Sequence, residues 1–223
     1  MTRSFLFVLG SGRTGGNTEI LARKAAEQLP SDVEQRWIHL SDHPLPDFED
    51  LRHDDSLPRA RPRPEGTEAL LLDATLHATD IVIASPLYWY SLSATAKRYL
   101  DYWDAWLETP ELDFKESLRG RTLWGVTALA HSEEEVAGPL IDTLNHTAAF
   151  FPMRFGGVLL GNGTRPGHVL ADEQALLRAK TFFAREAPVA RYPYEDTAGG
   201  TTDETAGDPA GDSDKAGDAV LTP

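Results

Sequence analysis

The chain has 223 residues, 41% of them hydrophobic, and a formal net charge of −14. This length and composition fit one globular domain with a sizeable core. The absence of cysteine excludes disulfides, a cysteine nucleophile and thiolate-bound metal or iron–sulfur centres. The acidic balance, with no basic stripe, argues against nucleic acid as a partner.

Half of the negative charge lies at the carboxyl-terminal end. Eight acidic residues against one lysine between 193 and 223 give −7. This stretch is rich in Gly, Ala, Thr and Asp, and it cannot bury enough apolar surface to offset the entropy of ordering. We predict a domain over residues 1–192 and a disordered acidic tail over 193–223. The apolar run 5–9 is too short for a signal peptide or a membrane span, so we expect a cytoplasmic protein that binds no membrane.

The first predicted strand, residues 4–9, is followed by a glycine-rich turn over 10–18 and by a helix from Asn17 or Thr18 to Leu29. The first N–H groups of a helix have no partner within it and carry partial positive charge, so an anion, most often a phosphate, binds there. Glycines let the backbone approach a ligand closely, serine and threonine hydroxyls add donors, and Arg13 adds a permanent cation. The turn therefore predicts a phosphorylated cofactor.

Two common nucleotide-binding motifs are incomplete in this turn. Its glycines fit the dinucleotide pattern G-x-G-x-x-G, but the acidic residue expected about 20 positions later is missing, and the nearest, Asp42, lies too far along. A Walker-type loop would need a lysine where Asn17 stands. Two alternatives stay open here, namely a turn that binds nothing and a protein that binds NAD through this turn.

The rest of the chain alternates strands and helices, which predicts a parallel sheet covered on both faces. Strands are predicted over 33–40, 81–84, 121–129 and 153–160, and helices over 67–77, about 93–107, 133–149 and 172–185. Gly138-Pro139 predicts a kink or a later start in the third of these helices. The proline-rich segment 41–66 is predicted to be a long surface loop, either a rim of the site or an irregular excursion.

A second notable loop, Ser85-Pro86-Leu87-Tyr88-Trp89-Tyr90-Ser91-Leu92-Ser93, follows the predicted strand 81–84. Three adjacent aromatic residues after a strand end cannot all face one core. Ligands of open parallel sheets bind beyond the carboxyl ends of the strands, so this loop and the glycine turn belong to one edge. An aromatic wall beside a phosphate site suits a phosphorylated planar ligand. The alternative is that the aromatic side chains plug the end of the sheet.

Two further patterns have structural alternatives. Tyr99, Trp103 and Trp106 share one helical face, which predicts either core packing or a dimer contact. The pair His39 and His43 has a spacing that a metal site on a helix would use, but a proline directly follows the second histidine and breaks such a helix. We therefore predict no metal site.

The residues Ser11 to Thr18, the loop Ala84 to Ser93 and Lys97 together resemble the NADPH-dependent FMN reductase family, a branch of the flavodoxin-like flavoproteins. The resemblance spans about residues 4–185. It implies an α/β, flavodoxin-like fold with a five-stranded parallel sheet in the order 2-1-3-4-5 and helices on both faces. It also implies bound FMN, NAD(P)H as a transient reductant, and a homodimer.

The family pattern assigns cofactor contacts to three loops. The FMN phosphate falls to Ser11, Arg13, Gly16, Asn17 and Thr18, the isoalloxazine to Pro86, Leu87, Tyr88, Trp89 and Tyr90, and the flavin pyrimidine to Ala130, His131 and Ser132. The third loop departs from the family pattern because it lacks a pair of glycine residues that is common there in relatives. His131 either hydrogen-bonds the flavin ring or stands in solvent.

The resemblance implies an FMN-dependent NAD(P)H oxidoreductase that passes reducing equivalents to a small acceptor such as a quinone, a nitro compound or a flavin. We assign no catalytic side chain, because hydride transfer to a flavin does not demand an acid or a base. The alternative is a flavodoxin-type electron carrier that does not oxidise nicotinamide. The sequence selects neither the acceptor nor NADPH over NADH.

Overall fold

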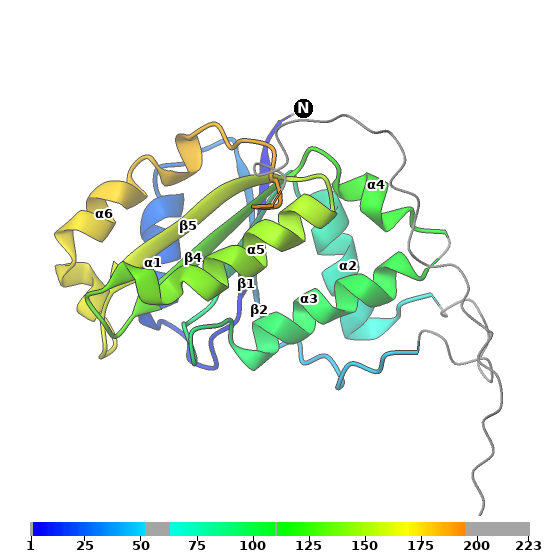
Figure 1. Ribbon diagram of the computed structural model, residues 1–223, viewed down its shortest axis with the longest axis horizontal. Helices are drawn as coiled ribbons and strands as arrows, with labels where there is room; N and C mark the ends of the chain where they lie inside the picture. The colour runs from blue at the N-terminus through cyan, green and yellow to red at the C-terminus, as the bar shows by residue number, and fades with distance from the viewer. Residues whose placement is uncertain (1, 52–62, 110, 195–223) are drawn as a thin grey trace, which may run out of the picture. The chain divides into compact units, whose positions relative to one another are not determined.

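A five-stranded, all-parallel sheet forms the centre of the computed structural model, which describes residues 2–51, 63–109 and 111–194 (Figure 1). The strands are β1 (Ser4–Leu9), β2 (Glu34–His39), β3 (Asp80–Ala84), β4 (Thr122–Leu129) and β5 (Arg154–Asn162). Their order across the sheet is β2-β1-β3-β4-β5. This order confirms the predicted flavodoxin-like topology.

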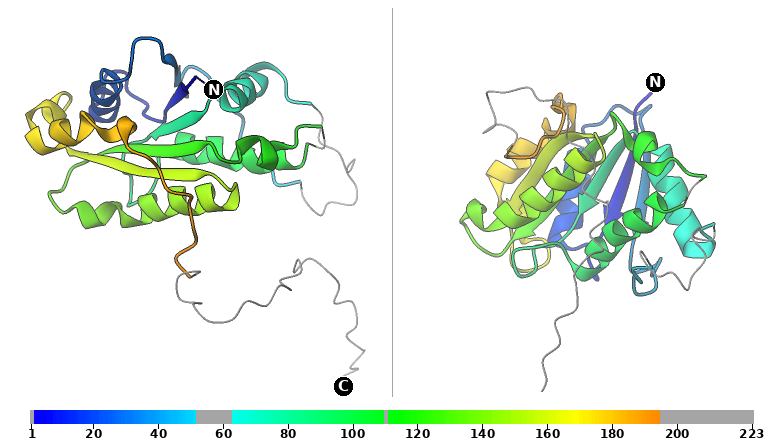
Figure 2. Two further views of the ribbon diagram at one scale, coloured as in Figure 1. Left: turned by 90° about the horizontal axis from the view of Figure 1, so that it is seen from above. Right: turned by 45° about the vertical axis from the view of Figure 1, so that its right-hand side comes forward.

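Helices cover both faces of the sheet, as Figures 1 and 2 show. The α-helices are α1 (Asn17–Ala26), α2 (Gly66–His77), α3 (Ala94–Leu107), α4 (Phe114–Leu118), α5 (Gly138–Phe150) and α6 (Glu173–Ala179), and the 3-10 turns are η1 (Glu134–Ala137), η2 (His168–Ala171) and η3 (Phe182–Ala184). The helices α1 and α6 lie on one face, while α2, α3 and α5 lie on the other.

Alternation along the buried strands divides the core into two layers. In β1, Leu6 and Val8 pack with the helices α2, α3, α4 and α5, whereas Phe5 and Phe7 pack with α1, α6 and η3. Successive side chains of a strand point to opposite faces, so a strand covered on both faces is apolar throughout. This explains why the run Phe5 to Leu9 shows no polar positions.

Several element boundaries differ from those predicted. The helix expected over 133–149 begins at Gly138, after η1, and the helix expected over 172–185 ends at Ala179 and is followed by η3. Helix α4 was not predicted, because five residues are too few to show a helical period. The described parts of the segment 41–66 form no helix or strand before α2, and residues 52–62 lie outside the described chain.

The aromatic stripe of α3 belongs to the core. Tyr99, Trp103 and Trp106 are each at most 1% exposed, and they pack edge to face with one another and with Phe114 of α4. A dimer contact through this face is therefore wrong, because the same chain already covers the stripe. The other alternative, core packing, is confirmed.

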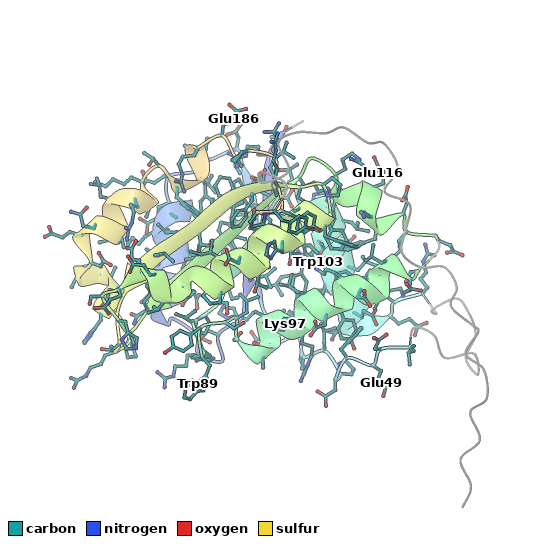
Figure 3. All side chains as sticks on the ribbon, viewed as in Figure 1. Glu49, Trp89, Lys97, Trp103, Glu116 and Glu186 are labelled. Carbon is teal, nitrogen blue, oxygen red and sulfur yellow. The ribbon has the colours of Figure 1, made fainter. Side chains whose placement is uncertain are left out.

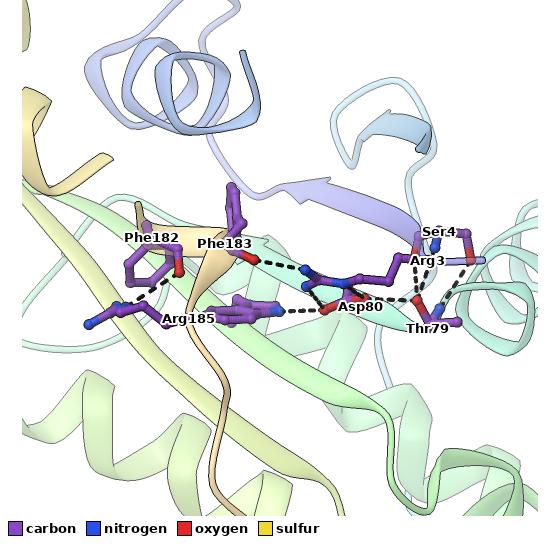
Figure 4. A network of polar contacts seen from close by, with 8 residues as sticks. Arg3, Ser4, Thr79, Asp80, Phe182, Phe183 and Arg185 are labelled. Atoms are coloured by element: carbon purple, nitrogen blue, oxygen red, sulfur yellow. Dashed lines mark hydrogen bonds and ion pairs between the residues drawn. The ribbon is translucent and has the colours of Figure 1, made fainter. Parts of the chain in front are cut away.

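A polar cluster fixes the amino ends of the strands, at the edge opposite the loops described below (Figure 4). The guanidinium of Arg3 donates to both carboxylate oxygens of Asp80, at 3.0 and 2.5 Å, and to the carbonyl of Phe183 at 2.8 Å. Trp124 donates its indole N–H to the same carboxylate at 2.9 Å. A buried charge is tolerated when it is paired in this way. The cluster connects β1, β3 and β4 to η3, near the end of the folded part of the chain.

The compact unit that carries these elements ends at Tyr192. Of the predicted tail 193–223, only Pro193 and Tyr194 belong to the described residues, so the predicted disorder there stays a prediction. Over the described residues, no helix has both the length and the apolar character that a membrane crossing requires.

Candidate functional site

The glycine turn between β1 and α1 leaves a row of exposed residues at the carboxyl edge of the sheet. Residues Gly12 to Gly15 are exposed, and the Ser11 hydroxyl accepts the backbone N–H of Arg13 at 3.0 Å. Gly15 has φ +66°, a left-handed conformation that favours glycine. Within the described chain the Arg13 guanidinium makes no hydrogen bond or ion pair, so it is available to a ligand.

The predicted phosphate contacts divide into available and committed groups. By helix geometry, the backbone N–H groups of Asn17 and Thr18 have no acceptor inside α1 and carry the positive end of its dipole. The Asn17 side chain is committed elsewhere, since its amide donates to the carbonyls of Gly163 at 2.7 Å and Arg165 at 2.9 Å and accepts from Val169 N–H at 3.3 Å. A contact from Asn17 to a phosphate would therefore use its main chain.

Glu19 is a residue at this site that the sequence reasoning missed. It is 4% exposed, and its carboxylate lies under the turn, where it accepts the Gly15 N–H at 2.7 Å. A glutamate three positions after the residue that caps a helix is a known pattern at helix starts, and that spacing was the available signal. The three-residue spacing between the cap residue Gly16 and Glu19 thus identifies Glu19 as the residue that supports the turn.

The aromatic loop after β3 forms a tight turn that presents its rings to solvent. Tyr88 and Ser91 exchange two backbone hydrogen bonds, at 3.0 and 3.1 Å, with Trp89 and Tyr90 between them at φ +49° and +65°. The exposed fractions are 54% for Tyr88, 92% for Trp89 and 54% for Tyr90. Figure 3 shows Trp89 projecting from the rim of the molecule. The alternative that these rings plug the end of the sheet is therefore wrong.

Direct hydrogen bonds join the glycine turn to the aromatic loop. The carbonyl of Gly10 accepts from the hydroxyls of Ser93 at 2.6 Å and Thr95 at 2.8 Å, while Gly10 N–H donates to the carbonyl of Ala84 at 2.9 Å. Ser93 also caps α3 by accepting the N–H of Ala96. The structure therefore brings these two loops together at one edge of the sheet.

The backbone of the aromatic loop is fixed from inside. The buried Ser85 hydroxyl accepts the N–H of Ser93 at 2.8 Å and donates to the carbonyl of Pro86 at 3.0 Å. Pro86 and Leu87 are half-buried at its base. The exposed rings thus stand on a rigid support, which favours a fixed ligand geometry.

The third predicted loop, Ala130 to Ser132, lies at the carboxyl end of β4 and is exposed. The carbonyl of His131 accepts from the side-chain amide of Asn162 at 2.5 Å, which joins the loop to the end of β5. The Ser132 hydroxyl donates to Glu133 at 2.8 Å, and this bond, more than any other interaction, holds the pKa of that exposed carboxyl below its ordinary value. His131 stands at the surface, with its main chain engaged in the structure.

A groove of about 610 Å³ adjoins this third loop at the ends of β4 and β5. Its walls include His131, Ser132, Asn162, His168 and Arg178. Groups of three or more His, Asp or Glu side chains able to hold a metal ion do not occur within the described residues. The groove therefore offers polar donors beside the loop assigned to the flavin pyrimidine.

The residues present fit a phosphorylated flavin. One loop offers free helix N–H groups and an arginine that has no ion-pair partner among the described residues. The loop bonded to it offers three exposed rings that contribute little to the core. The first set matches a phosphate and the second matches a planar conjugated ring. The individual cofactor contacts stay predictions.

Known proteins share both the sequence pattern and the fold. The family described as NADPH-dependent FMN reductase matches residues 4–164. A curated protein of Bacillus subtilis (strain 168), YwqN, named as a candidate NAD(P)H-dependent FMN-containing oxidoreductase, is 34% identical over 178 residues, which cover 79% of this chain and 94% of that protein.

Two solved structures illustrate the likeness in three dimensions. The Trp repressor binding protein from Bacillus subtilis is 28% identical, with a TM-score of 0.63, over 82% of this chain and 99% of that one. An FMN-dependent NADH-azoreductase from Bacillus anthracis, solved with FMN, is 13% identical and has a TM-score of 0.57 over 83% and 99% of the two chains, a likeness of fold alone. With this topology and the match over residues 4–164, the chain belongs to the NADPH-dependent FMN reductase family.

Proposed function

We propose that this protein is an FMN-dependent NAD(P)H oxidoreductase whose flavin lies across the two joined loops at the carboxyl edge of β1 and β3. The observation that carries the proposal is the pair of hydrogen bonds from Ser93 and Thr95 to Gly10. They hold a phosphate-binding turn and an exposed aromatic turn side by side, as the two ends of one FMN molecule require.

Each loop has a distinct task in the proposal. Ser11, Arg13 and the first N–H groups of α1 bind the phosphate, and the rings of Tyr88 to Tyr90 and the base formed by Pro86 and Leu87 lie along the isoalloxazine. Ala130, His131 and Ser132 contact the pyrimidine edge. When bound, FMN accepts hydride from the nicotinamide and passes electrons on. The chain orients the ring and limits water on the side covered by the loop.

Membership of a reductase family favours this function over the flavodoxin-type carrier. The exposed aromatic turn leaves the outer side of the site open to small planar molecules. The acceptor in the proposal is accordingly a small molecule such as a quinone, a nitro compound or a flavin, which takes the place of the oxidised nicotinamide.

An absorbance spectrum of the purified full chain, before and after anaerobic addition of NADPH, tests this function. We expect yellow protein, or uptake of FMN on titration, and bleaching far faster than that of free FMN at the same concentration. Bound flavin that is not bleached by NADPH or NADH would support the carrier instead. Colourless protein that takes up no FMN would remove the proposal, and retained nicotinamide would favour an NAD-binding protein.

The proposal also includes a homodimer and a cytoplasmic location. The buried stripe of α3 is not available to a partner, whereas the turn Tyr88 to Tyr90 is exposed and apolar enough to take part in a contact. Light scattering on the purified protein with and without FMN measures the mass, and fractionation of cells that express the protein locates it. A monomer under both conditions would contradict the dimer without affecting the proposed activity.

A further inference from the structure

A buried carboxylate lies directly under the turn that the proposed function assigns to the phosphate. Glu19, the third residue of α1, is 4% exposed. One of its oxygens accepts the N–H of Gly15 at 2.7 Å, and the other accepts from Arg23 Nε at 2.9 Å and Nη2 at 2.7 Å. His39, the last residue of β2, places its Nε2 3.5 Å from that second oxygen.

Neighbouring groups stabilise the negative charge of this buried carboxylate. Burial by itself raises the pKa of Glu19, but the hydrogen bonds from Gly15 and Arg23 and the electrostatic influence of the neighbouring His39 and Arg23 side chains outweigh it, so the pKa lies below its ordinary value of 4.5. Glu19 is therefore ionised at neutral pH. Arg23 lies on the same face of α1, one turn later, and compensates the charge.

The hydrogen bond to Gly15 has a direct consequence for an incoming phosphate. The N–H of Gly15 points inward to Glu19 and is not free to face a ligand. The bond also fixes the peptide of a residue at φ +66°, a conformation that an unrestrained glycine would adopt only part of the time. Hydrogen bonds within the chain therefore hold the shape of the turn.

We propose that Glu19 is a positioning residue for the phosphate group of FMN, and this inference rests on the proposed function. Its carboxylate holds the turn at Gly15 in the binding shape before the cofactor arrives. The phosphate is then bound by the N–H groups of Gly16, Asn17 and Thr18 and by Arg13, while Glu19 itself touches no ligand. Ordering the turn in advance lowers the entropy lost on binding.

A purely structural role for Glu19, as a residue that caps α1, would predict a different pattern of binding. Loss of a cap lowers the stability of the fold, and any flavin would then bind more weakly. Loss of a residue that positions the phosphate turn affects only a ligand that carries a phosphate. Riboflavin, which is FMN without the phosphate, separates the two roles.

The experiment measures the dissociation constants of FMN and riboflavin for the full-length apoprotein and three variants. Glu19→Ala should weaken FMN binding about tenfold or more and leave riboflavin binding unchanged. Glu19→Gln, whose amide oxygen can still accept the Gly15 N–H, should stay within about threefold of the unchanged protein for FMN. Glu27→Gln, at the end of the same helix and paired with Lys24, is the matched control and should change neither constant.

Unchanged FMN affinity in Glu19→Ala would overturn the inference, and so would an equal loss of FMN and riboflavin affinity. Because Glu19→Ala can fail to fold, amide hydrogen exchange of the unchanged apoprotein gives a second test. The Gly15 amide should already be protected without FMN, and FMN should add protection at Gly16, Asn17 and Thr18. Protection of Gly15 that arises only with FMN would overturn the inference. A wild-type protein that binds neither flavin would instead contradict the proposed function itself.

Discussion

Ser93 donates its hydroxyl to the carbonyl of Gly10 at 2.6 Å, and this bond joins residues 83 positions apart in the sequence. Ser93 simultaneously caps α3, so one buried side chain sets the start of that helix and the position of the glycine turn. The shape of the site therefore depends on a residue that need not touch the cofactor.

Replacement of Ser93 tests this dual role. Ser93→Ala removes the cap and the bond to Gly10, and we expect it to lower the free energy of unfolding by about 1–3 kcal/mol and to weaken FMN binding. Thr95→Val removes only the second hydroxyl on Gly10 and is expected to cost less. Urea unfolding and FMN titration measure both effects. Equal stability of Ser93→Ala and the unchanged protein would contradict the role of the bond.

The Arg13 guanidinium should contribute to cofactor affinity through the phosphate alone. Arg13→Gln is expected to raise the dissociation constant of FMN about tenfold, because a charge-assisted hydrogen bond to the phosphate is lost. The constant for riboflavin should not change, and the FMN effect should shrink as salt is added. Arg119→Gln, an exposed arginine paired with Glu116, serves as the control. Equal losses for both flavins would assign Arg13 a different role.

Substitutions in the aromatic turn should have opposite effects on the stability of the fold and on the binding of FMN and the acceptor. Trp89 and Tyr90 have positive φ angles, which cost bulky residues free energy. The double variant Trp89→Asn, Tyr90→Gly supplies the residues that such a two-residue turn favours, so it should be more stable by about 1 kcal/mol. It should also bind FMN and the acceptor more weakly, since the aromatic wall is gone.

Thermal melts and flavin titration check this pair of effects together. Leu177→Gln, which removes a 58% exposed apolar residue of α6, is the control and should leave flavin binding unchanged. A double variant that is less stable than the starting protein would show that the rings contribute packing that outweighs the strain of their backbone.

The hydroxyl of Tyr99 should make the free energy of unfolding depend on pH in the alkaline range. Burial raises its pKa to about 12 from an ordinary value of 10.0, and the hydroxyl lies 2.6 Å from that of Thr75. Between these two pKa values the Tyr99 hydroxyl keeps its proton in the folded state and loses it in the unfolded chain. Its contribution to the free energy of unfolding is therefore fully present below pH 10 and falls as the pH rises from 10 towards 12. Unfolding free energies for Tyr99→Phe should fall less steeply over this interval.

The contact of β5 with Trp124 should be intolerant of any side chain at Gly156. A Cβ atom placed there would lie 2.0 Å from the indole ring, which is itself buried and bonded to Asp80. Gly156→Ala should therefore destabilise the fold by roughly 1–3 kcal/mol or more. Gly138→Ala, at the start of α5, should be neutral or slightly stabilising, because a Cβ there would meet no described atom within 4 Å outside its chain neighbours and the backbone of its own helix. Thermal unfolding compares the two.

The sequence alone determined the five strands, the longer helices and the edge of the sheet that carries the two unusual turns. Four apolar runs and the run 33–40, which charged residues interrupt, alternate with helical patterns and predict the parallel sheet. Both unusual turns follow strands, so their shared edge follows from topology. The start of α3 at Ala94, directly after its cap Ser93, agrees with the predicted start at about residue 93, and the later start of α5 at Gly138 is one of the two outcomes that Gly138-Pro139 predicted, because capping residues and prolines act through local geometry.

Only the tertiary structure decided which side chains are free and which are committed. Asn17 looks like a phosphate ligand in the sequence, yet its amide holds the segment Gly163 to Val169. Glu19 looks like a surface residue of a helix, yet it is buried under the turn. The aromatic residues of α3 are core, while those at 88–90 are exposed. The assignments of Asn17 and of the aromatic residues depend on contacts between segments distant in the chain, and local sequence patterns carry no information about those contacts.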